Sequence, residues 1–172
     1  MHSQLAPSKG ERKGLVLHGI TGSGKTQLAL RYVADYGDTY SHILWISAAS
    51  DPEAELSFAE AARTIMANGS ILSTAKTDRD YIHACLEKHL EPNWLIVLDS
   101  LDSLTIGSRH YLPKGNRGSV LITSTRADTK YRYRFSGLEV SGLDEASACK
   151  LLTSLAHLPS TKQGVLESTR GM

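Results

Sequence analysis

The stretch Gly19-Ile20-Thr21-Gly22-Ser23-Gly24-Lys25-Thr26 follows the pattern GxxxxGK[ST], in which a glycine-rich loop wraps a polyphosphate. The apolar residues 15–17 before it are typical of a buried strand, and residues 26–30 after it are typical of a helix. A loop in this position points its backbone N–H groups at an anion, which then lies at the positive end of the helix dipole. The sequence therefore predicts a site for a nucleoside diphosphate or triphosphate.

Each residue type in this loop has a chemical reason. We expect glycine where the turning backbone needs positive φ and leaves no room for a side chain. Lys25 can reach the β and γ phosphate oxygens, and the hydroxyl of Thr26 can bind Mg²⁺. The alternative is a glycine-rich turn followed by a surface lysine. The predicted nucleotide-binding residues of this loop are Gly19, Gly22, Ser23, Gly24, Lys25, Thr26 and Gln27.

A second group of polar residues follows the run Trp94-Leu95-Ile96-Val97-Leu98, which is apolar enough to be a buried strand. Ligands of open α/β sheets gather at the carboxyl ends of the strands, so Asp99 is expected to hold Mg²⁺ through a water molecule. We predict Asp99 and Asp102 as the catalytic carboxylates, and Thr26 and Asp99 as the metal-binding pair. Each aspartate could instead cap a helix, Asp102 for the segment 103–108.

A third strand-like run, residues 118–124, ends in hydroxyl side chains and is followed closely by Arg126. We expect Arg126 at the same sheet edge as Asp99. Its planar guanidinium matches two phosphate oxygens, so it is predicted to bind the nucleotide and to sense whether a γ-phosphate is present. The alternative is that Arg126 pairs with carboxylates on the surface.

Short apolar runs alternate with helical patterns along the chain, which predicts an α/β fold with a mainly parallel sheet of five strands. Helical spacing of apolar residues recurs after Asp51, over residues 82–90 and from Ala148, where Asp144 is the expected N-cap. We therefore expect the three-layer αβα sandwich of the P-loop NTPase class. The candidate strands are residues 15–18, 42–46, 94–98, 120–124 and 135–140.

Composition fits a cytoplasmic protein. The chain has 172 residues, 41% of them hydrophobic, and a formal net charge of +1, so its charge balance predicts no nucleic-acid partner. The basic residues of the segment 130–135 alternate with aromatic ones, which we interpret as a solvated strand edge, with a nucleic-acid strand as the alternative. Cys85 and Cys149 lie in helical patterns and are expected to be buried free thiols. No apolar run in the sequence is long enough to span a bilayer.

Five motifs follow one another in a specific order: residues 19–29, 43–47, 94–102, 118–126 and 140–143. Together they resemble the NB-ARC family, the nucleotide-binding domains of NOD-like receptors (NLRs) in innate immunity and of related signal-transduction (STAND) ATPases. The resemblance covers roughly residues 14–157. It implies that the strand before Arg126 lies between the strands that precede the phosphate-binding loop and Asp99.

The resemblance also implies a function. Such domains resemble switches in which ADP holds a resting form, and exchange for ATP or dATP permits oligomerisation. We therefore expect ATP or ADP with Mg²⁺ as cofactors, and other domains or protomers of an NLR-like assembly as partners. The expected organisation is a polar segment over residues 1–13, the nucleotide-binding domain over 14–157 and a C-terminal tail over 158–172, where a missing helical domain would start.

One departure from the family pattern bears on catalysis. Many relatives carry a second acid where this chain has Ser100, so we expect at most a slow P-loop ATPase. An alternative function is that of a P-loop small-molecule kinase or another phosphoryl-transfer ATPase, although no arginine-bearing lid or acceptor pocket is recognisable in the sequence.

Overall fold

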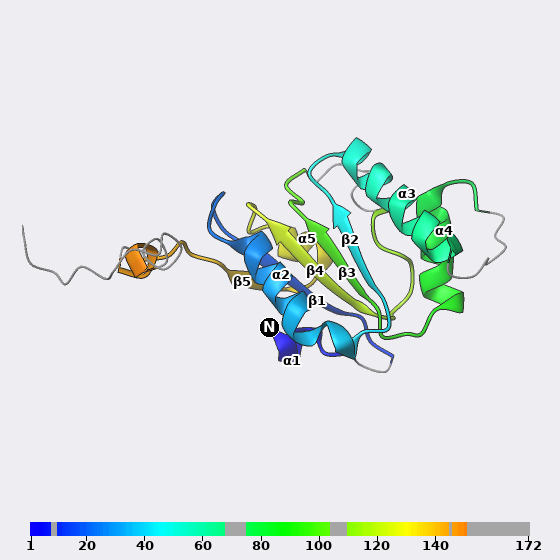
Figure 1. Ribbon diagram of the computed structural model, residues 1–172, viewed down its shortest axis with the longest axis horizontal. Helices are drawn as coiled ribbons and strands as arrows, with labels where there is room; N and C mark the ends of the chain where they lie inside the picture. The colour runs from blue at the N-terminus through cyan, green and yellow to red at the C-terminus, as the bar shows by residue number, and fades with distance from the viewer. Residues whose placement is uncertain (8–9, 68–74, 104–109, 145, 151–172) are drawn as a thin grey trace, which may run out of the picture. The chain divides into compact units, whose positions relative to one another are not determined.

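Five parallel strands form one sheet (Figure 1). The computed structural model describes residues 1–7, 10–67, 75–103, 110–144 and 146–150. The strand order β2-β3-β4-β1-β5 and the parallel pairing confirm the predicted α/β fold of the P-loop NTPase class. The strands are β1 (Lys13–His18), β2 (Ile43–Ser47), β3 (Leu95–Asp99), β4 (Ser119–Ser124) and β5 (Ser136–Glu139).

Helices cover both faces of the sheet, which gives the expected three layers (Figure 1). One face packs against α1 and α2, and the other packs against α3, α4 and the π-helical turn η2. The short helix α5 lies beside β1 on the second face. The helices are α1 (His2–Leu5), α2 (Lys25–Tyr36), η1 (Gly37–Thr39), α3 (Asp51–Ala67), α4 (Asp78–Ala84), η2 (Cys85–His89) and α5 (Thr129–Tyr133).

The two faces bury separate apolar cores, because successive strand residues point to opposite sides. Val16, Ile96 and Ile122 belong to the core under α3 and α4. Leu17 and Leu121 belong to the core under α2. All five side chains are fully buried, so the central strands read as continuous apolar runs in the sequence.

Two expectations from the sequence are wrong. Residues 129–133 form the helix α5 and not a strand edge; Tyr131 is 75% exposed, whereas Tyr133 and Phe135 pack against the core. Cys85 is a buried free thiol as predicted, but Cys149 is exposed.

The chain divides into two compact units, residues 1–141 and 142–172. In the second unit, Asp144 caps a helix as predicted, because its Oδ1 accepts the backbone N–H of Ser147 at 2.8 Å. The predicted boundary after residue 157 and the tail over 158–172 lie outside the described residues and stay predictions. Within the described ranges, no helix has the length and apolar character needed to cross a membrane.

Gly115 and Gly118 allow a matched test of packing in the first unit. Both have positive φ, 93° and 75°, but only at Gly118 would a Cβ atom overlap the ring of Trp94. We expect Gly115→Ala to lower the free energy of unfolding by about 1 kcal/mol and Gly118→Ala to lower it by about 2–4 kcal/mol. Urea denaturation of both variants measures the difference. Equal losses would show that Trp94 does not pack against Gly118.

Candidate functional site

The phosphate-binding loop joins the end of β1 to the start of α2, as predicted. Gly22 has φ of 80° and Gly24 has φ of 94°, a left-handed conformation that glycine adopts without strain. The expectation of crowding holds only at Gly19, where a Cβ would overlap the carbonyl oxygen of Val140. Space is open at Gly22 and Gly24, so backbone conformation alone explains glycine there.

The ammonium of Lys25 lies against its own loop. Its Nζ donates to the carbonyl oxygen of Gly19 at 2.8 Å and to that of Ile20 at 2.7 Å. An ammonium has three N–H donors, so one remains for a phosphate oxygen. These contacts keep a positive charge beside the N-terminus of α2, where an anion is favoured.

Asp99 connects the ends of three elements. Its Oδ1 accepts hydrogen bonds from the hydroxyls of Thr26, at the start of α2, and Thr123, near the end of β4, at 2.8 and 2.6 Å. The hydroxyl of Thr123 in turn accepts the backbone N–H of Ser100 at 2.8 Å. The structure therefore brings Thr26 and Asp99, the two residues predicted to bind the metal, into direct contact.

Hydrogen bonds of Asp102 connect the loop after β3 to the end of β4. Its Oδ1 accepts the backbone N–H of Thr125 at 2.6 Å and lies 3.1 Å from the hydroxyl of Ser124. In the same loop Ser100 has φ of 62°, a conformation that costs a non-glycine residue on the order of 1–3 kcal/mol. Asp102 thus holds the loop in place, and its catalytic role stays a prediction.

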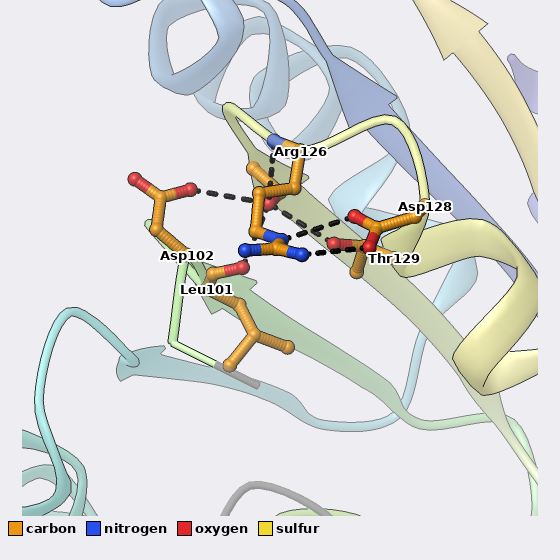
Figure 2. Close-up of polar contacts among 6 residues, drawn as sticks. Leu101, Asp102, Arg126, Asp128 and Thr129 are labelled. Atoms are coloured by element: carbon orange, nitrogen blue, oxygen red, sulfur yellow. Dashed lines mark hydrogen bonds and ion pairs between the residues drawn. The ribbon is translucent and has the colours of Figure 1, made fainter. Parts of the chain in front are cut away.

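Arg126 is paired with a carboxylate. Figure 2 shows its guanidinium directed at Asp128, with Nε 3.0 Å from Oδ1 and Nη2 2.7 Å from Oδ2. Hydrogen bonding within this exposed pair raises the pKa of Arg126 and lowers the pKa of Asp128. The contact is the surface pairing that the sequence left open as the alternative. The role of Arg126 toward a γ-phosphate stays a prediction.

A cavity of about 330 Å³ lies beside the loop. Six predicted site residues line it, whereas Gly19, Ser23, Asp99 and Arg126 do not. Sequence reasoning missed Thr123 and Asp128, although Thr123 could have been found from the predicted neighbouring strands, which place it beside Asp99. The lining residues are Thr21, Gly22, Gly24, Lys25, Thr26, Gln27, Ser100, Asp102, Ser124 and Thr125.

These residues fit a nucleotide phosphate with Mg²⁺. The hydroxyl of Ser23, inside the loop, is buried and has no hydrogen-bond partner in the described part of the chain. The ranges that the structure describes contain no group of three or more His, Cys, Asp or Glu residues able to hold a metal ion. Mg²⁺ commonly shares one or two protein ligands with substrate phosphates, and Thr26 with Asp99 match that pattern.

Comparison with known proteins supports the fold. No profile of a known protein family matches the sequence, and no curated protein matches it. Cdc6p from Pyrobaculum aerophilum is similar in structure, with a TM-score of 0.59 and 13% identity over 91% of this chain and 46% of that chain. A DNA replication initiation factor has a TM-score of 0.53 and 17% identity over 90% of this chain and 48% of that chain.

The chain therefore shares the fold of these two proteins, and its strand order is that of a P-loop NTPase core. It spans a little under half the length of these two proteins.

Thr123 provides a test of the contacts around Asp99. Thr123→Val keeps the shape of the side chain but removes the hydroxyl that serves both Asp99 and the N–H of Ser100. We expect the free energy of unfolding to fall by about 1–3 kcal/mol, because buried polar groups lose their partner. Thr125→Val, at an exposed position of the same segment, should change it by less than about 0.5 kcal/mol. Denaturant titration compares the two, and similar losses would contradict the contact.

Proposed function

We propose that this chain is the adenine-nucleotide-binding domain of an NLR-type signalling switch. It binds ADP or ATP together with Mg²⁺, and in isolation it hydrolyses ATP slowly or not at all. The contact between Thr26 and Asp99, beside Lys25 and its loop, is the observation that carries the nucleotide site. The five ordered motifs that resemble NB-ARC domains support the choice of adenine nucleotide and of a switch.

Different residues of the site are proposed to bind the phosphates and the metal ion. Backbone N–H groups of the loop and Lys25 would hold the phosphates, and Thr26 and Asp99 would hold Mg²⁺. When bound, the metal ion neutralises charge on the phosphate oxygens. The buried hydroxyl of Ser23 offers one more polar contact at the loop.

The same residues support weak hydrolysis. Ser100 occupies the position after Asp99 where many relatives have an acid, and a serine hydroxyl is a poor base for activating water. Among the described residues that line the cavity, Asp102 is the only carboxylate, and its Oδ1 is engaged by the loop contacts with Thr125 and Ser124. The proposed partners are therefore protein domains or protomers that respond to the bound nucleotide. The net charge of +1 favours such partners over nucleic acid.

Nucleotide-dependent melting tests the binding proposal. We expect ADP with Mg²⁺ to raise the melting temperature, because a ligand selective for the folded state stabilises it by about 2.7 kcal/mol at a hundredfold excess over Kd. Lys25→Ala should weaken binding by about tenfold to a hundredfold through loss of a charge-assisted contact. Lys114→Ala, an exposed lysine outside the cavity, is the matched control. A shift with GTP but none with ADP or ATP would overturn the choice of adenine nucleotide.

Phosphate release by the same samples tests the second part of the proposal. The expected rate lies far below the roughly 1–100 per second of competent kinases. Turnover above about one per second by the chain alone would identify an efficient enzyme and contradict the switch.

Because Arg126 pairs with Asp128, two variants should change the ratio of ATP affinity to ADP affinity in opposite directions if Arg126 senses the γ-phosphate. Arg126→Ala should lower the affinity for ATP relative to ADP, because a phosphate contact is lost. Asp128→Asn should raise that ratio, because it frees the guanidinium from its carboxylate. Titration with labelled ATP and ADP measures both ratios. If neither variant changes the ratio, Arg126 serves only the surface pair.

A further inference from the structure

The two edges of the sheet differ in chemistry. Edge strands expose unpaired backbone groups, and proteins usually protect them with charge, proline, short length, a bulge or a covering helix or loop. β5 fits this description, because it has four residues and ends in the charged Glu139. β2, at the other edge, is Ile-Leu-Trp-Ile-Ser and carries no charge; Ile43 at its start is 37% exposed.

The backbone of β2 leaves hydrogen-bonding groups on its outer side. Toward β3, the carbonyl of His42 accepts the N–H of Leu95 at 2.9 Å, and the N–H of Ala48 donates to the carbonyl of Asp99 at 2.7 Å. The alternation of a parallel ladder then turns the N–H and C=O of Ile43 and Trp45 away from β3. Because β2 is the last strand of the sheet, no strand of the described residues pairs with that side; at its end, the outward N–H of Ser47 donates to the hydroxyl of Ser57 in α3 at 3.1 Å.

A groove of about 440 Å³ runs along this edge. His42 and the β2 residues 43–45 form one side, and the α3 residues Glu60, Ala61, Thr64 and Ile65 contribute to the other. The groove therefore combines an open backbone edge with a partly apolar wall, which is the arrangement used when an extended peptide adds a strand to a sheet.

Charge indicates which peptide fits. Glu60 is the only acidic or basic residue among those lining the groove apart from His42, and its carboxylate makes no hydrogen bond or ion pair within the described residues. A cationic side chain would match it. A second copy of the chain would bring another Glu60, and its own β2 has no cation to offer.

Spacing adds a further constraint. Glu60 and Thr64 are one helical turn apart, about 6 Å, and side chains at i and i+2 of a strand are about 6.7 Å apart on one face. One side chain of the added strand can thus reach Glu60 while the next on that face lies near Thr64 and Ile65.

We propose that this groove, the β2 groove, binds an extended peptide segment of a partner protein by strand addition. The segment carries an apolar residue and a Lys or Arg two positions apart. This interaction is separate from the nucleotide site and does not depend on the proposed function.

A displayed library of random heptapeptides, selected on the whole chain, tests the proposal without a known partner. We expect enrichment of an apolar residue two positions from Lys or Arg. The same selection on Glu60→Lys should replace that Lys or Arg by Asp or Glu. Failure to enrich any peptide, or an unchanged charge preference on Glu60→Lys, would overturn the proposal.

Three variants then locate the binding of one enriched, labelled peptide by fluorescence polarisation. Ile43→Pro removes an outward N–H that the sheet does not use, and proline is tolerated on an edge strand. Thr64→Arg fills the groove and places a cation one helical turn from Glu60, where the two side chains can pair. Because Thr64 is an exposed helix position, this variant should fold and keeps the proposal testable if Ile43→Pro does not fold. Leu56→Ala, on the same helix and exposed but outside the groove, is the control.

We expect affinity to fall at least tenfold for Ile43→Pro and Thr64→Arg and to be unchanged for Leu56→Ala. Circular dichroism checks that each variant is folded. Equal affinity of Thr64→Arg and the natural chain would overturn the proposal. A concentration-dependent dimer in sedimentation, abolished by Thr64→Arg, would identify a second copy as the occupant and would also overturn it.

Discussion

The placement of β4 between β1 and β3 is the constraint on which the rest of the site depends. In a parallel sheet every carboxyl end lies at the same edge, so this order gathers three loops that are distant in the sequence. His18 pairs with Ser124, and Leu98 pairs with Ile122, which sets the ends of β1, β3 and β4 side by side. The glycine-rich loop, Asp99 and the hydroxyl residues of β4 meet there because the register aligns the ends of the three strands.

At that edge of the sheet, a few buried hydrogen bonds fix the positions of the side chains relative to one another. Thr123 is 1% exposed, and its single hydroxyl both donates to Asp99 and accepts from the N–H of Ser100. Burial makes such a contact costly to leave unsatisfied, so it fixes the carboxylate of Asp99 next to Thr26. Ser100 then keeps a left-handed φ because the contacts on both sides of it determine its conformation.

Much of this arrangement could be predicted from the sequence. The strands read as apolar runs because both faces of the sheet are covered, and the loop follows a pattern whose residues have chemical reasons. The helix α5 could not be predicted, because its single turn is too short to show helical periodicity and the alternation of residues 130–135 mimics a strand. The partner of Arg126 could not be predicted from the sequence either. Asp128 lies only two residues away, and a guanidinium can pair with a local carboxylate or reach a distant phosphate without any difference in the sequence pattern.

Lys25 and Gly19 contribute contacts that hold the loop together from within. The ammonium of Lys25 donates hydrogen bonds to the carbonyl oxygens of Gly19 and Ile20, while the backbone of Gly19 lies against Val140, beyond the end of β5. Such contacts within the loop restrict its conformations, and a more restricted loop loses less entropy when it binds a phosphate. The same contacts mean that replacing Lys25 removes a ligand contact and loosens the loop at once. A measured loss of affinity for Lys25→Ala would then contain both effects, the lost phosphate contact and the loosened loop. The free energy of unfolding of the variant without nucleotide reports the second effect alone.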